Sequence, residues 1–207
     1  MRTVKRALVA AGIAFAGASL WWRRNPSAMP YWQRWFVELP HPGITRARLI
    51  EILDPQPRER ILEVGPGTGY YSLTVADKLE RGRLEVYDLQ QEMVDHVLER
   101  AKERGLKNVT AWKGDAQDML FEDNRFDGAY LTVMLGEIPD QDAALRELRR
   151  VVKPGGRVVV GEIAADPHMV TFGALRERAG NAGLEYERRV GGALAYFARF
   201  RVPPAAG

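Results

Sequence analysis

The chain has no cysteine among its 207 residues and only three histidines. Without thiols it has no disulfide, no zinc–thiolate site and no cysteine nucleophile. Internal repeats and low-complexity linkers are also absent, which argues against solenoid and disordered classes. With 46% hydrophobic and 28% charged residues, the composition is that of one globular domain with an appendage, and no metal site is predicted.

The chain after residue 24 also lacks an excess of positive charge, although the pI of the whole sequence is about 9.3. The whole chain carries a formal charge of +3, whereas residues 1–24 contain five basic side chains and no acid, which leaves −2 for the remainder. A nucleic-acid-binding domain is expected to keep its positive charge on the folded body. We therefore expect no nucleic-acid partner.

Residues 7–22 (ALVAAGIAFAGASLWW) carry no charge and have arginine or lysine on both sides. As a helix they would extend about 24 Å, against a hydrocarbon core of about 30 Å. A cleaved signal peptide, a helix buried against the domain and an uncleaved anchor all fit this pattern. We favour the third of these, in which residues 1–28 form an uncleaved membrane anchor. The domain is then expected in the cytoplasm, where the cofactor inferred below is made.

Residues 29–42 form a segment whose aromatic side chains lie between Pro30 and Pro40. Trp32, Trp35 and Phe36 are spaced at i, i+3 and i+4, which places them on one face of a helix. This face either packs on the domain or lies at a membrane surface as an interfacial helix. We expect the segment to help cover the active site.

Residues 43–207 alternate between strand and helix patterns, which favours a parallel sheet with helices on both faces. The predicted strands cover residues 60–64, 84–87, 109–112, 126–132, 157–163, 184–190 and 194–202. The predicted helices cover residues 43–53, 70–79, 91–104, 140–152 and 167–182. A Lys-Pro-Gly-Gly turn at 153–156 ends the fourth of these helices, and glycines 191–192 indicate a closing hairpin.

The strongest local motif is EVGPGTG at residues 63–69, between a predicted strand and a predicted helix. Glycines there permit a sharp turn and let a ligand approach the backbone closely. No Gly-Lys-Ser/Thr sequence follows, so a phosphate-binding P-loop is excluded. Glu63 adds a carboxylate, which suits a cationic ligand better than a pyrophosphate.

Asp88 ends the second predicted strand, 19 residues after Gly69. A carboxylate at this position accepts hydrogen bonds from ribose hydroxyls in other nucleotide-binding α/β units. The alternative is an aspartate that caps the following helix. With the glycine loop in register, we favour the ribose.

Four motifs occur in order: EVGPGTG, VYDLQQEMV, GDAQDMLFEDNRFDGAYL and LRELRRVVKPGGRVVVGE. Over residues 49–162 the sequence resembles the class I S-adenosylmethionine-dependent methyltransferases. The greatest resemblance is to the group that includes ubiquinone and menaquinone C-methyltransferases (methyltransferase type 11) and small-molecule or lipid methyltransferases. The resemblance implies a Rossmann-like, doubly wound α/β/α fold with seven strands, the last of them antiparallel.

The resemblance also implies S-adenosylmethionine as the cofactor and nine residues that bind it: Glu63, Gly65, Gly67, Gly69, Asp88, Leu89, Met93, Asp115 and Ala116. The first four would hold the methionine portion, Asp88 the ribose, and the next two the adenine. Asp115 would accept from the adenine amino group, and Ala116 would donate its backbone N–H to the ring.

Methyl transfer from a sulfonium is an in-line displacement that requires alignment rather than a covalent intermediate. A general base is needed only if the acceptor loses a proton. Glu137 and His41 are the candidates for this role. As alternatives, Glu137 caps the helix near residue 140 and His41 is an exposed loop residue.

The membrane segment indicates a hydrophobic acceptor, such as a phospholipid headgroup, a prenylated quinone precursor or another lipophilic small molecule. Two rival functions are a non-catalytic S-adenosylmethionine-binding or membrane-recruitment protein and an aminopropyl transferase of the same fold.

Overall fold

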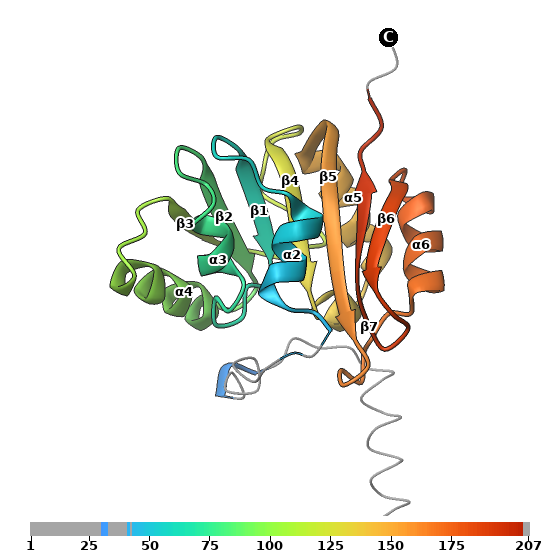
Figure 1. Ribbon diagram of the computed structural model, residues 1–207, viewed down its shortest axis with the longest axis horizontal. Helices are drawn as coiled ribbons and strands as arrows, with labels where there is room; N and C mark the ends of the chain where they lie inside the picture. Colours follow the sequence, from blue (N-terminus) through green and yellow to red (C-terminus); the bar gives the residue numbers. More distant parts are fainter. Residues whose placement is uncertain (1–29, 33–40, 42, 205–207) are drawn as a thin grey trace, which may run out of the picture.

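The computed structural model describes residues 30–32, 41 and 43–204, which form a sheet with helices on both faces (Figure 1). The predicted anchor at 1–28 lies outside the described residues, as does most of the aromatic segment 29–42. Within the described ranges, no helix is both long enough and apolar enough to cross a membrane.

The sheet has seven strands in the order β3-β2-β1-β4-β5-β7-β6. Their bounds are β1 Arg60–Val64, β2 Arg83–Asp88, β3 Val109–Lys113, β4 Phe126–Thr132, β5 Val152–Ile163, β6 Glu185–Gly191 and β7 Ala195–Arg201. Strands β1 to β5 pair in parallel, whereas β7 runs antiparallel to both β5 and β6. The predicted seven-stranded sheet with an antiparallel last strand is therefore confirmed.

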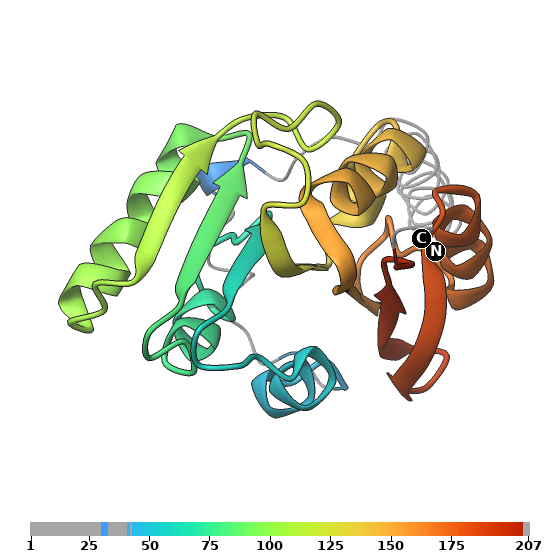
Figure 2. The same cartoon turned by 90° about the horizontal axis from the view of Figure 1, so that it is seen from above.

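Two apolar layers hold the helices on the sheet, because successive strand residues face opposite sides. Leu62 and Val158 belong to the core under α5 and α6, whereas Ile61 and Val159 belong to the core under α2, α3 and α4. Figure 2 shows α5 and α6 on one side of the sheet, with α2 and α3 on the other. The helices are α2 Arg46–Leu53, α3 Ser72–Ala76, α4 Gln91–Glu103, α5 Gln141–Val151 and α6 Phe172–Asn181.

Several predicted boundaries are wrong: α2 starts at Arg46 rather than 43, and α6, α3 and β5 also differ from their predicted ranges. Helix α6 starts at Phe172 rather than 167, because the Asp166 carboxylate accepts a hydrogen bond from the His168 backbone N–H (2.9 Å) and holds a turn there. Helix α3 is only five residues long, since residues 69–71 remain in turns. Strand β5 begins at Val152 rather than 157, so it includes the predicted turn at 153–156. Its pairing with β4 shifts register there, between Phe126 and Gly128 of β4, and Gly155 has φ +80°.

A buried arginine ties α2 to the sheet. Arg157 is 7% exposed, and its guanidinium forms an ion pair with the Glu59 carboxylate at 2.5 Å. It also donates to the backbone carbonyls of Asp54 (3.0 Å) and Leu53 at the end of α2. These bonds satisfy a charge that would otherwise be costly to bury.

We expect Arg157→Met to lower the free energy of unfolding by about 2–4 kcal/mol, because it removes the ion-pair partner of the partly buried Glu59 carboxylate and the side-chain donor to the Leu53 carbonyl. Arg104→Met is the matched control, since the Arg104–Asp77 ion pair is exposed on both sides and its loss is expected to cost less than about 1 kcal/mol. Urea unfolding measures both values. Equal losses would contradict the role given to Arg157.

Candidate functional site

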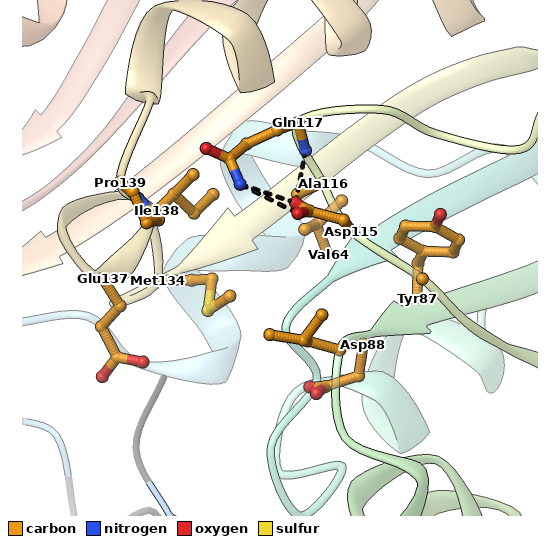
Figure 3. Close-up of a pocket in the computed structure, with 12 residues that line it drawn as sticks. Val64, Tyr87, Asp88, Asp115, Ala116, Gln117, Met134, Glu137, Ile138 and Pro139 are labelled. Carbon is orange, nitrogen blue, oxygen red and sulfur yellow. Dashed lines mark hydrogen bonds between the residues drawn. The ribbon is translucent and has the colours of Figure 1, made fainter. Parts of the chain in front are cut away.

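A pocket lies at the carboxyl ends of β1, β2 and β3 and beside the loop that follows β4 (Figure 3). Strands β1 and β4 are neighbours, and from them the chain continues toward opposite edges of the sheet. Open α/β sheets bind ligands at such a point, where the strand order reverses. The pocket has a volume of about 280 Å³, just below the range typical of small-molecule sites. Its lining residues are Val64, Tyr87, Asp88, Leu89, Gly114, Asp115, Ala116, Gln117, Met134, Glu137, Ile138 and Pro139.

The glycine loop adopts a backbone that other residues would strain. Gly65, Gly67 and Gly69 have φ of +66°, +54° and +82°. A Cβ at Gly65 would lie 2.5 Å from the Met134 Cγ, so the loop passes close to the segment that follows β4. The Gly65 N–H donates to the Tyr87 carbonyl at 2.9 Å, which ties the loop to β2. These glycines do not line the pocket themselves but border it.

Glu63 lies on β1, two residues before this loop, and is 2% exposed. Its Oε2 is buried and has no hydrogen-bond partner of ordinary geometry among the described residues. Burial raises the pKa of this carboxyl to about 7, and the Asp88 charge adds to the rise, while the nearby Ser72 and Tyr130 hydroxyls lower it. A buried carboxyl of this kind is suited to receive a cationic or hydrogen-bonding partner.

Asp88 ends β2 and lines the pocket, as predicted. Burial raises the pKa of its carboxyl to about 6, although hydrogen bonds from the backbone of Gln90 and Leu89 oppose the rise. Its Oδ1 accepts from the Gln90 N–H at 2.8 Å. Gln90 is the N-cap of α4 and its own side chain makes no cap hydrogen bond. Asp88 therefore stands before the cap position, and its carboxylate supports the start of α4 through the Gln90 N–H as well as lining the pocket.

The four predicted adenine-side residues differ in where the structure places them. Leu89 lines the pocket and is 51% exposed, and Ala116 lines it while nearly buried. Met93 is buried in α4 and does not line the pocket. Asp115 is exposed in the loop after β3, and its Oδ1 accepts from the Gln117 N–H at 2.8 Å.

Sequence reasoning missed Gly114 and Tyr87. A Cβ at Gly114 would lie 1.9 Å from the Tyr87 hydroxyl oxygen, so only glycine lets this tyrosine cross beneath the loop. The Gly114 N–H donates to the Asp88 carbonyl at 2.9 Å, which joins the loops after β2 and β3. The signal was present, because Gly114 directly precedes Asp115 in the third motif.

Glu137 lies in the short 3₁₀ helix Leu135–Glu137 and lines the pocket opposite Asp88 (Figure 3). The alternative that it caps α5 is wrong, because Asp140 is the N-cap and accepts from the Ala143 N–H at 2.9 Å. Glu137 therefore reaches the pocket by way of the loop that follows β4. Its neighbours Met134, Ile138 and Pro139 form the apolar part of the same wall.

His41 does not line the pocket. Its ring packs edge-on against Tyr70 and stacks on Tyr71, at centroid distances of 5.4 and 6.2 Å, just after the glycine loop. The ring is partly buried, which corrects the alternative of an exposed loop residue, and burial lowers its pKa. An imidazole in this environment is held neutral near pH 7.

A family model described as a methyltransferase domain matches residues 61–156. This segment runs from β1 into β5 and contains the glycine loop and the whole pocket lining.

The demethylmenaquinone methyltransferase of Bacillus cereus (strain B4264) is 34% identical over 130 residues, which make up 61% of this chain and 54% of the relative. The protein of the same name from Bacillus cytotoxicus is 33% identical over 130 residues, with the same 61% and 54% coverage. The chain thus spans about half the length of the curated relatives it matches.

Among solved structures, a SAM dependent methyltransferase from Aquifex aeolicus has a TM-score of 0.78 at 20% identity, covering 84% of this chain and 100% of that chain. The [4+2]-cyclase SpnF has a TM-score of 0.70 at 22% identity, covering 77% and 80% of the two chains. These likenesses show the fold. Together with the matched domain, the comparisons support the predicted class of S-adenosylmethionine-dependent methyltransferases and S-adenosylmethionine as the cofactor.

The raised pKa of Glu63 makes a prediction for stability. Between pH 4.5 and about 7 the folded state keeps a proton that the unfolded state releases, so the free energy of unfolding falls as the pH rises through this window. Glu63→Gln removes this dependence. From pH 5 to pH 8.5, we expect the variant to lose about 2–3 kcal/mol less than the natural protein.

Urea unfolding at both pH values measures this difference. Buried carboxyls that do not interact with Glu63, such as Glu162, are shared by the two proteins and cancel in the comparison. Parallel pH profiles for the two proteins would show that Glu63 titrates normally.

Proposed function

We propose that the protein is a methyltransferase that moves the methyl group of S-adenosylmethionine to a small, hydrophobic or lipid-like acceptor. The observation that carries this proposal is the convergence of three predicted carboxylates at one edge of the sheet. Glu63, Asp88 and Asp115 stand at or just beyond the carboxyl ends of three adjacent strands, beside a loop that needs glycine.

The residues present fit this cofactor. The Glu63 carboxylate is buried beside the pocket lining, with the Ser72 and Tyr130 hydroxyls near it and no cation close by among the described residues, so it suits the positively charged methionine portion. The pocket-lining Asp88 carboxylate suits the ribose hydroxyls, and Asp115 suits the amino group of adenine. A Cβ at Gly65 would press on Met134, so the loop needs glycine to pack against the segment that follows β4 at the wall of the pocket.

When bound, S-adenosylmethionine would supply an electrophilic methyl group on a positively charged sulfur. The chain's residues would then act by holding the two reactants in line and excluding water. Glu137 is the candidate to take a proton from the acceptor, because its carboxylate reaches the pocket from the loop after β4. His41 is the second candidate, since its neutral ring lies beside the tyrosines that follow the glycine loop.

The acceptor we propose is of the quinone type. The relatives that share 130 residues with this chain are named for demethylmenaquinone, a prenylated quinone. The uncharged residues 7–22 and the Trp32 side chain, which is 68% exposed, favour a protein that meets a lipophilic acceptor at a membrane, with its domain in the cytoplasm.

The alternative is a protein that binds the cofactor without transferring its methyl group. A specific observation keeps it open, because the fold is shared with a protein described as a [4+2]-cyclase. An assay of methyl transfer separates the two readings.

Calorimetry of S-adenosylmethionine binding to the full chain tests the cofactor site. We expect micromolar binding at pH 8, and Asp88→Ala to weaken it by about tenfold to a hundredfold, because a charged hydrogen-bond acceptor is lost. Binding is also expected to weaken as the pH falls below 7, since a protonated Glu63 no longer attracts a cation. A folded chain that binds nothing would refute the proposal.

Glu137→Gln tests the proposed base. With the quinol form of a short-chain demethylmenaquinone as acceptor, we expect kcat to fall by about a hundredfold or more while the Kd for S-adenosylmethionine stays the same. His41→Gln is the matched variant for the second candidate. An unchanged kcat in both would mean that neither residue takes a proton in the rate-limiting step.

A further inference from the structure

Gln117 connects two walls of the pocket, and no motif predicted a role for it. We propose that Gln117 is a positioning residue that aims the Asp115 carboxylate at the 6-amino group of a purine, and thereby makes the site selective for adenine over 6-oxo purines. This inference rests on the proposed function, because it assumes that an adenosyl group occupies the pocket.

The hydrogen bonds of Gln117 fix both ends of its side chain. Its Nε2 donates to the Asp115 Oδ1 at 3.0 Å and to the Oδ2 at 2.9 Å, as the dashed lines in Figure 3 show. Its Oε1 accepts from the Asp140 backbone N–H at 2.9 Å, where α5 begins. One amide therefore joins the loop after β3 to the start of α5.

The orientation of this amide follows from the chemistry of its partners. An ionised carboxylate only accepts hydrogen bonds, and a backbone N–H only donates. If the amide were flipped, its oxygen would face the Asp115 carboxylate and its NH₂ would face the Asp140 N–H. Both contacts would be repulsive, so the amide has one workable orientation.

The other end of the bridge is anchored by a helix terminus. Asp140 is the N-cap of α5, and in a capping box the residue three positions later returns a bond to the N-cap N–H. Here that residue is Ala143, which has no side-chain acceptor. Gln117 supplies the missing acceptor from another loop and is itself held in place by it.

Counting acceptor positions shows what remains for a ligand. A carboxylate offers about four lone-pair positions. On Asp115, the Gln117 backbone N–H and Nε2 take two on Oδ1, and Nε2 takes one on Oδ2. One position on Oδ2 remains on a side chain that lines the pocket. An amino group would satisfy it, whereas the oxygen of a 6-oxo purine would be repelled.

The test compares S-adenosylhomocysteine with S-inosylhomocysteine, which has an oxygen in place of the 6-amino group and a proton on N1, by calorimetry on the full chain. We expect the natural protein to prefer the adenosyl compound by about tenfold or more. In Gln117→Leu the preference should shrink to about threefold or less, because the Asp115 carboxylate loses its orientation. In Gln117→Glu, a second negative charge beside Asp115 should weaken binding of the adenosyl compound about tenfold.

Gln56→Leu is the matched control, because Gln56 also donates from its amide (3.0 Å to the Asp54 carbonyl) but lies outside the pocket. Its ligand preference should equal that of the natural protein. Thermal unfolding without ligand confirms that each variant is folded.

The outcomes separate this inference from the proposed function. A natural protein that binds neither compound refutes the proposed function and this inference with it. If the natural protein binds and prefers the adenosyl compound, but Gln117→Leu keeps the preference or loses affinity equally for both ligands, only the role of Gln117 is refuted. A collapse of the preference confined to the Gln117 variants supports it.

Discussion

The site depends on the position of β1 in the middle of the sheet. This strand pairs in parallel with β2 on one side and β4 on the other, and the chain leaves β1 and β4 toward opposite edges. The loops after these strands therefore diverge and leave a space between them. Short backbone bonds, from Gly65 to Tyr87 and from Gly114 to Asp88, then draw the loops after β1, β2 and β3 together on one side of that space.

Burying Glu63 works against folding and in favour of binding. A carboxylate without a partner in the interior is costly, and the protein reduces this cost by holding the group partly protonated near neutral pH. Under the proposed function, a cationic ligand would remove this cost by supplying the missing counter-charge. The Arg157 bridge holds α2 on the sheet.

Much of the fold was readable from sequence because its signals are local. The strands 60–64 and 126–132 were predicted to the residue, since apolar runs there are bounded by turns. The start of α6 was missed because an aspartate side chain mimics a backbone turn before it. In the site, Asp88, Asp115 and Glu137 were predicted and do line the pocket, since strand ends meet at one edge. Gln117 was missed because its partner Asp140 is 23 residues away and no motif connects them.

The crossing of Tyr87 beneath Gly114 has a consequence for related sequences. The space that any side chain at position 114 would need is filled by the tyrosine hydroxyl, 1.9 Å from where a Cβ would stand. Neither position is free to change alone, because a larger residue at 114 requires a shorter one at 87. Across homologues the two positions are expected to covary, so that a larger side chain at 114, in the loop after β3, accompanies a smaller one at 87 in β2. Substitutions at these two positions on the adenine side of the pocket are therefore expected to occur together, whereas an exposed neighbour such as Leu89 can be substituted alone.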